Sequence, residues 1–336
     1  MTVSLALRHS REVSAATRQR IQQLARAHGY RPDPAIVRLM HHLRQRRPAR
    51  AKANLAGLLG ARWTLPQRTG NFMSRLCEGL TARADALGYA FSVFSTDDYP
   101  GDGQLGRVLA SRGIEGLIIL PLPRPADLSG LLDWSAFSVV SATPSVLAPH
   151  FHAVMPNHFE NMLTVCAALT AQGFQRIGLA IPSDWDARVR HRWTGALLWQ
   201  NAFGATQPIP PLLTPGPGPV LDLAAFVAWL RREKPDAVIS DAISRSTLVA
   251  GLARLPALLR PKIITMNWPD PPFDAGLDQR PEHLGASAID VLAGQLTRGE
   301  KGIPAVPSST LIEGAWQGPT LVLARTARRK IRRPAR

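Results

Sequence analysis

From Asn54 to about Leu311, short apolar runs alternate with segments of helical periodicity. This alternation predicts an α/β fold, in which doubly wound parallel sheets are covered by helices and joined by right-handed crossovers. The predicted strands are Leu55–Gly60, Tyr89–Ser95, Gly116–Leu120, Phe137–Ser141, Arg176–Ile181, Ala237–Ser240 and Lys262–Met266. The predicted helices are Phe72–Leu87, Gln104–Arg112, Phe159–Gln172, Val189–Ala202, Leu223–Arg232, Arg245–Arg254 and Glu282–Thr297.

A helix that ends in a glycine turn and leads into a strand occurs twice, in residues 71–120 and 158–181. This repetition predicts two similar lobes joined by crossings, which is typical of the periplasmic-binding-protein-like fold. Ligands of such sheets bind at the carboxyl ends of the strands, so we expect a ligand cleft between the lobes. The crossings are predicted in Val139–Val154, Asn267–Gln279 and Ser308–Gln317.

Basic residues are concentrated at the two ends of the chain, whose formal net charge is +16. Residues 1–52 carry a net charge of +10 and residues 325–336 carry +7, whereas residues 53–324 are nearly neutral at −1. A neutral body with basic ends is typical of a nucleic-acid-binding protein. The alternative is that the basic ends only aid solubility.

Several classes of protein are disfavoured by what the sequence lacks. No uncharged apolar run approaches the roughly 18 residues of a membrane span, and no secretory signal precedes the first apolar run, so we expect a cytoplasmic protein. Cys77 and Cys166 have no metal-ligand spacing and are expected to be reduced core thiols. Motifs for nucleophilic catalysis, phosphate binding or zinc binding are not found, so we expect no enzyme activity, no metal and no cofactor.

Three N-terminal segments have the pattern of a small helical unit. Thr2–Leu7 is a short amphipathic segment, and Val13–Ile21 contains Ser14, a good N-cap for the helix that follows. Gly29 stops that helix at a position suited to a left-handed C-cap, and Tyr30-Arg31-Pro32 follows it. The order and separation of these segments are more specific than any one of them.

These segments resemble the DNA-binding headpiece of lactose-repressor (LacI/GalR) family regulators, beginning at the recognition helix. The resemblance covers nearly the whole chain and implies four parts. They are a partial helix-turn-helix headpiece in residues 1–32, a hinge helix and linker in 33–52, a two-lobed effector-binding and dimerisation core in 53–322, and a basic disordered tail in 323–336.

The resemblance also implies which residues contact DNA. Thr2 and Ser4 match positions that touch phosphates or bases, and Leu5 stands where several relatives have a base-reading side chain. A leucine cannot donate to guanine, so it is expected to contact a thymine methyl group or simply to pack. The full set of implied contacts is Thr2, Ser4, Leu5, Arg8, Ser14, Thr17, Arg18, Tyr30, Arg38, Leu39 and Met40.

Leu39, with Met40 beside it, matches the leucine that relatives insert into the minor groove. Apolar side chains inserted between base steps unstack and kink the duplex. The alternative is an ordinary interdomain helix with an exposed leucine. The basic hinge segment is expected to fold when it binds DNA.

Family headpieces begin with a helix of about a dozen residues that packs on the recognition helix. Here the segment that resembles the recognition helix begins at Thr2, directly after Met1. We therefore expect an in-frame segment upstream of Met1 that encodes this helix. The alternative is a headpiece-deficient protein that binds effector but no operator.

The resemblance places the effector site on the loops between the lobes. Arg192 falls on the element with which relatives bind sugar hydroxyls or anionic groups, and a guanidinium suits both; a structural salt bridge is the alternative for it. Arg188 and Arg190 are expected to be solvated. For Trp63 and Trp268, as for each tryptophan taken alone, packing in the core is the alternative to contact with a sugar ring. The implied effector residues are Trp63, Asn71, Phe72, Arg192, Asp241, Asn267 and Trp268.

Together, these observations predict a homodimeric, sequence-specific transcription regulator of the repressor type. Its expected partners are a roughly palindromic double-stranded DNA operator and a small-molecule effector, a sugar by resemblance. The alternatives from other classes are a solute-binding protein, which needs an export signal, an enzyme on the same fold, and the headpiece-deficient effector binder.

Overall fold

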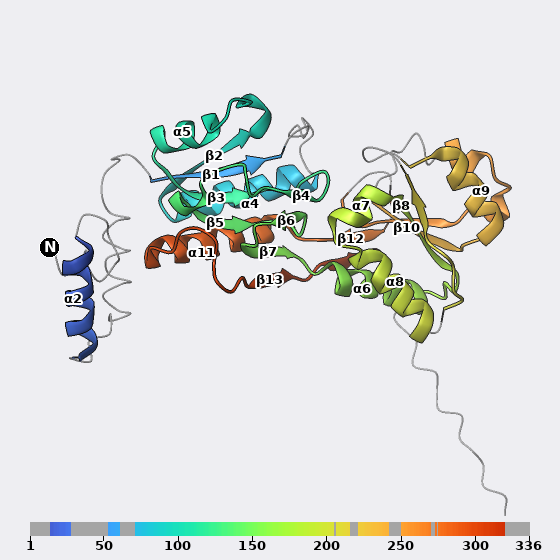
Figure 1. Cartoon of the computed structure of the whole chain (residues 1–336). Coiled ribbons are helices and arrows are strands. Elements are labelled where there is room, and N and C mark those ends of the chain that lie inside the picture. The colour runs from blue at the N-terminus through green and yellow to red at the C-terminus, as the bar shows by residue number, and fades with distance from the viewer. Residues whose placement is uncertain are drawn as a thin grey trace, which may run out of the picture.

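A computed structural model of the chain describes residues 14–27, 53–60, 71–204, 206–215, 221–241, 250–269, 273 and 275–319 (Figure 1). Two six-stranded sheets organise the described residues between 53 and 317 into two lobes, and helix α2 (Ala15–Ala27) precedes them in the chain. The predicted α/β class, with two doubly wound lobes of mainly parallel strands, is confirmed.

The first lobe contains a fully parallel sheet with the order β13-β7-β5-β3-β1-β2. Helices α4 (Phe72–Ala86) and α11 (Pro281–Arg298) cover one face, and α5 (Gln104–Ser111) covers the other. The strands of this sheet are β1 (Ala53–Leu59), β2 (Tyr89–Ser95), β3 (Ile114–Ile119), β5 (Ser138–Ser141), β7 (His152–Pro156) and β13 (Ser309–Ile312). Shorter elements complete the lobe: η1 (Thr96–Asp98), β4 (Ala126–Asp127), η2 (Trp134–Ala136) and β6 (Val146–Ala148), with β4 and β6 paired in parallel.

Alternate side chains of one strand explain why helices cover both faces of this sheet. Leu55 and Leu59 of β1 join the cluster under α4 and α11, whereas Ala56 and Leu58 join the cluster under α5. All four side chains are buried, as expected for a central strand of a doubly covered parallel sheet.

The second lobe has the order β14-β12-β11-β10-β8-β9, in which only the β12–β14 pair is antiparallel. Its strands are β8 (Ile177–Pro182), β9 (Leu212–Thr214), β10 (Ala237–Ser240), β11 (Lys262–Thr265), β12 (Gly276–Asp278) and β14 (Ala315–Gln317). Its helical elements are α6 (His158–Ala171), α7 (Ser183–Arg188), α8 (Arg192–Phe203), α9 (Leu223–Glu233) and η3 (Ala257–Leu259).

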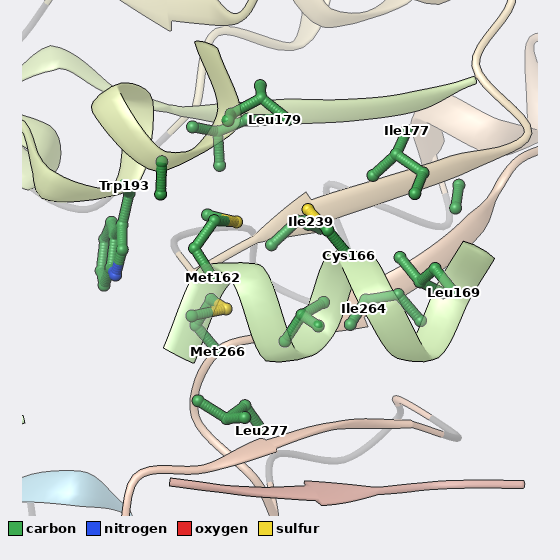
Figure 2. Close-up of a cluster of buried hydrophobic side chains, with 14 of the residues drawn as sticks. Met162, Cys166, Leu169, Ile177, Leu179, Trp193, Ile239, Ile264, Met266 and Leu277 are labelled. Atoms are coloured by element: carbon green, nitrogen blue, oxygen red, sulfur yellow. The ribbon is translucent and has the colours of Figure 1, made fainter. Parts of the chain in front are cut away.

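Figure 2 shows the core between α6 and this sheet, where Met162, Cys166 and Leu169 of the helix lie among side chains of the strands. Trp193 of α8 closes the end of the same cluster and is 2% exposed. The other face of the sheet packs against Phe226 and Trp229 of α9. Cys166 is therefore a buried thiol, and burial raises its pKa to about 12.

Most predicted elements occur within one to three residues of their expected bounds, and two strands, β2 and β10, have them unchanged. The predicted helix Arg245–Arg254 lies partly outside the described residues. The helix predicted from Val189 begins instead at Arg192, because Arg190 and His191 adopt left-handed φ values of 58° and 55°.

The chain passes between the lobes after β7 at Asn157, after β12 at Gln279 and Arg280, and after β13 at Glu313 and Gly314. The second and third passages agree with the predicted crossings. The predicted crossing Val139–Val154 is wrong, because that stretch forms β6 and parts of β5 and β7 within the first lobe. Pro144 lies between β5 and β6 and Pro149 between β6 and β7, so the strands of this stretch are short.

Two glycines allow α4 and α11 to touch backbone to backbone. A Cβ added at Gly285 of α11 would lie 2.5 Å from the carbonyl oxygen of Leu76 and 2.7 Å from the amide nitrogen of Leu80, both in α4. Gly79 of α4 faces the backbone of Glu282 at a similarly close approach. Because neither backbone can yield as a side chain does, any larger residue must separate the helices.

We predict that Gly285→Ala lowers the free energy of unfolding by about 2 kcal/mol, because the added methyl group forces the two helices apart. Gly195→Ala in α8 is the matched control, since nothing lies within 4 Å of a Cβ at that position. There the same substitution should stabilise by about 0.5 kcal/mol through the unfolded state. Urea denaturation measures both, and equal effects would contradict the packing argument.

Candidate functional site

A cavity of about 220 Å³ lies between the two lobes, at the carboxyl ends of strands from both sheets. In doubly wound sheets this is where ligands bind. The residues that line it are Asn71, Phe72, Met73, Pro121, Ala142, Thr143, Pro144 and Pro156 from the first lobe, and His158, Trp185, Arg188, Val189, Trp193, Asp241, Asn267 and Gln279 from the second lobe and the passages.

The start of α4 forms the wall on the side of the first lobe. Asn71 caps the helix, because its side-chain oxygen accepts a hydrogen bond of 2.9 Å from the backbone nitrogen of Ser74. This bond fixes the side chain of Asn71 at the cavity edge and places Phe72 in the first turn beside it.

Arg188, the last residue of α7, brings a cation into the cavity wall. Its guanidinium stacks on the ring of Trp185 at 3.9 Å from the ring centre, a cation–π contact. Burial lowers the pKa of Arg188 to about 10, and the nearby carboxylate of Asp241 opposes that shift. Asp241 follows β10 directly, so the positive and negative charges of the wall come from two adjacent loops of one lobe.

Three buried polar atoms of lining residues have no hydrogen-bond partner within the described part of the chain: His158 Nδ1, Trp193 Nε1 and Gln279 Oε1. The amide nitrogen of Gln279 is occupied, since it donates to the carbonyl of Met266 and, at 3.1 Å, to Asn267 Oδ1. The indole nitrogen is a donor and the amide oxygen is an acceptor. A ligand that satisfies both must therefore accept and donate hydrogen bonds.

Ion pairs between the lobes flank this cavity. Arg75 of α4 donates to the carbonyl of Trp268 at 2.7 Å and to Asp278 of β12 at 3.1 Å, and it also binds Glu282 of α11 at 2.8 Å. Arg124 of the first lobe pairs with Asp184 of α7 at 2.8 Å. The Arg75 side chain is only 14% exposed, whereas that of Arg124 is 54% exposed, so the Arg75 contacts contribute more to the lobe arrangement.

The structure brings four of the seven implied effector residues to this cavity: Asn71, Phe72, Asp241 and Asn267. Arg192 lines a second, neighbouring cavity instead, and Trp268 contributes its backbone carbonyl to Arg75. Trp63 lies outside the described residues.

Arg188, expected to be solvated, lines the cavity, and so do His158 and Gln279, for which no role in a site was predicted. The sequence offered one signal for Gln279, which is its place at the end of a predicted crossing.

Of the residues implied in DNA binding, the structure describes Ser14, Thr17 and Arg18, and the others lie outside the described residues. Ser14 caps α2 as predicted, since its Oγ accepts from the backbone nitrogen of Thr17 at 3.3 Å and donates to Thr17 Oγ1 at 2.8 Å. Arg18 lies one residue further along the same helix and is partly buried.

Among the described residues, no three His, Cys, Asp or Glu side chains come together as metal ligands would. In the same part of the chain, no helix has the length and apolar character needed to span a bilayer.

Residues 1–33 match a family model described as bacterial regulatory proteins of the lacI family. No curated protein sequence matches the chain. The N-terminal match falls on the segments whose order and spacing carried the resemblance to this family.

Solved structures of regulators share the fold of the chain. A transcription regulator like protein from Staphylococcus haemolyticus gives a TM-score of 0.59 at 14% identity, covering 80% of this chain and 98% of that one. The CelR–cellobiose complex gives 0.56 at 18% identity, covering 94% of both chains. The lac repressor dimer bound to operator and an anti-inducer gives 0.52 at 18% identity, covering 94% of this chain and 92% of that one.

The chain therefore carries the lacI-family signature at its N-terminus and the fold of LacI-family regulators over its length.

His158 makes the stability of this site dependent on pH. Burial, and then the charges of Arg188 and Arg192, lower its pKa from 6.5 to about 3, so the folded protein keeps the ring neutral. The unfolded chain takes up a proton below about pH 6.5, and stability is therefore lost as the pH falls from 6.5 toward 3.

We predict that the wild type loses about 1.4 kcal/mol more unfolding free energy than His158→Phe between about pH 7.5 and 5.5. Phenylalanine keeps a ring for the edge contact with Trp193, whose centre lies 5.5 Å from the His158 ring. Urea denaturation at both pH values measures the difference, and parallel losses in the two proteins would show that His158 is not buried and neutral.

Proposed function

We propose that the chain is a sequence-specific DNA-binding transcription regulator of the repressor type, and that a carbohydrate bound between its lobes controls its affinity for an operator. The observation that carries the proposal is the combination in one chain of a lacI-family N-terminus and a ligand-sized cavity between two lobes. The basic charge of residues 1–52 supports a nucleic-acid partner for that part of the chain.

The chemistry of the cavity supports a neutral, polyhydroxylated ligand. Trp193 needs an acceptor and Gln279 needs a donor, and a hydroxyl group supplies both. Trp185 and Phe72 present aromatic surface suited to the apolar face of a sugar ring. Because Asp241 lies near the charge of Arg188, the wall does not demand an anionic ligand.

We assign effector contacts to the residues that line the cavity, with Asn71 and Phe72 on the first lobe and Arg188, Asp241 and Asn267 on the second. A ligand that touches both sets binds tightly only at one angle between the lobes. It therefore shifts the population of lobe arrangements by the difference in its affinity for them.

We propose further that the lobe angle controls whether the hinge segment, residues 33–52, orders on DNA within a homodimer. A homodimer presents two equivalent headpieces, which matches a roughly palindromic operator. Coupling between operator and effector is then reciprocal, and it is typically about 1–3 kcal/mol.

The effector assignment is tested by thermal shift with a panel of mono- and oligosaccharides. We expect at least one saccharide to raise the melting temperature of the full chain, and Asn71→Ala to reduce that rise, because the substitution removes a polar group from the cavity edge. Asn54→Ala is the matched control, since Asn54 bonds Arg112 at the opposite, amino end of β1. An equal reduction in both variants, or no response to any saccharide, would refute the carbohydrate assignment.

The same saccharide should change the affinity for a duplex selected from a random pool by about 5- to 150-fold, as allosteric coupling usually does. Fluorescence anisotropy with labelled duplex measures this change. Failure to enrich any sequence over bulk DNA would contradict the regulator function itself.

Leu39→Ala should weaken binding to the selected duplex more than binding to random duplex, because an inserted leucine acts only where the duplex is kinked. We expect a loss of about tenfold or more on the selected sequence and little change on random DNA. Val37→Ala, two residues away, is the control. Equal losses on both duplexes would remove the minor-groove role from Leu39.

A further inference from the structure

A second cavity, of about 240 Å³, adjoins the first and is also lined by both lobes. Thr143 and Pro144 belong to the walls of both cavities. The second cavity extends along the β5–β7–β13 side of the first sheet, where His150 and Ser309 lie, and meets the turn between α7 and α8. That turn brings two arginines, Arg190 and Arg192, to the cavity.

The turn has a backbone conformation that L-residues adopt at a cost. Arg190 and His191 are consecutive and both have positive φ values, of 58° and 55°. Each left-handed residue other than glycine costs about 1–2 kcal/mol, and such residues concentrate where a structure holds a ligand. Two such residues in succession persist only where the surrounding contacts compensate for their strain.

A buried carboxylate holds this turn in place. Asp186 is 0% exposed, and its Oδ1 accepts from the backbone nitrogen of Thr194 at 3.2 Å while its Oδ2 lies 2.8 Å from Nδ1 of His191. The backbone nitrogen of His191 also donates to the carbonyl of Asp186 at 2.9 Å. These bonds fix the residue between the two arginines, so both arginine Cα positions are fixed as well.

The two guanidinium groups reach the cavity without an acidic neighbour. The residues that line it include no aspartate or glutamate within the described part of the chain. Arg192 donates from Nη1 to the carbonyl of Val189 at 3.3 Å, and its pKa is lowered first by burial and then by the charge of Arg190. The repulsion between the two cations is relieved if an anion lies between them.

We propose that this cavity is a binding site for a small, doubly charged oxyanion, best matched by a phosphate monoester, and that Arg190 and Arg192 bind its oxygens. Guanidinium groups form paired, charge-assisted hydrogen bonds to phosphate, and two of them match its two charges. His150, Ser309 and Thr143 on the opposite wall offer further polar groups, and Phe151 offers an apolar surface for the carbon part of an ester. This cavity shares Thr143 and Pro144 with the carbohydrate cavity, but the two arginines line only this one, and the anion proposal does not depend on the carbohydrate assignment.

Isothermal titration of the full chain with inorganic phosphate and with glycerol 3-phosphate, at constant ionic strength, tests the proposal. We expect both anions to bind with 1:1 stoichiometry and Arg190→Gln to weaken binding by about tenfold or more. Arg190 is exposed, so this variant should fold normally. Arg190→Lys, which keeps the charge but loses the planar fork, should give an intermediate loss.

Arg107→Gln in α5 is the matched control, because it removes the same charge from an exposed arginine that does not line the cavity. Equal weakening in Arg107→Gln and Arg190→Gln would show a general charge effect and overturn the site, as would no binding at about 10 mM anion. Asn71→Ala separates the two proposals, since it should leave the phosphate affinity unchanged even where it abolishes a response to saccharide. A loss of phosphate binding in Asn71→Ala would also overturn a separate anion site.

Discussion

The guanidinium group of Arg75 connects the two lobes beside the cavity. It binds Glu282 within its own lobe, while Asp278 and the carbonyl of Trp268 reach it from the other lobe. Because this cation is largely buried, loss of its partners would leave a charge that water cannot fully solvate, which makes the group of contacts strongly cooperative. This cluster of charges, together with the Arg124–Asp184 pair and the three chain passages, holds the two walls of the cavity at their distance.

Much of the fold follows from local sequence patterns. The strands Tyr89–Ser95 and Ala237–Ser240 have their predicted bounds, because each follows a clear turn signal, Leu87-Gly88 for the first and Pro235-Asp236 for the second. The three-residue strands β12 and β14 carry no periodicity of their own and form because β12 pairs with β11 on one side and with β14 on the other. Strands of that kind depend on tertiary contacts, which a window of sequence does not contain.

The candidate site was predictable where position alone places a side chain. Asn71 and Asp241 lie at a helix start and at a strand end, and both elements were predicted. It was not predictable that Arg188, rather than Arg192, lines the first cavity. This placement depends on two successive left-handed residues, which shorten α8 at its start and direct Arg192 to the neighbouring cavity. Neither arginine nor histidine signals a positive φ, as glycine would.

The glycine contact between α4 and α11 has a consequence for how movement spreads through the first lobe. Helices whose backbones touch cannot slide past each other by exchanging side-chain rotamers, so the pair moves as one stiff rod. α4 spans about 22 Å from the cavity to its far end, where Tyr89 pairs with Ala53, the first residue of β1. A small tilt of the α4–α11 pair at the cavity end is therefore transmitted to the start of β1, where residues 1–52 join the two lobes.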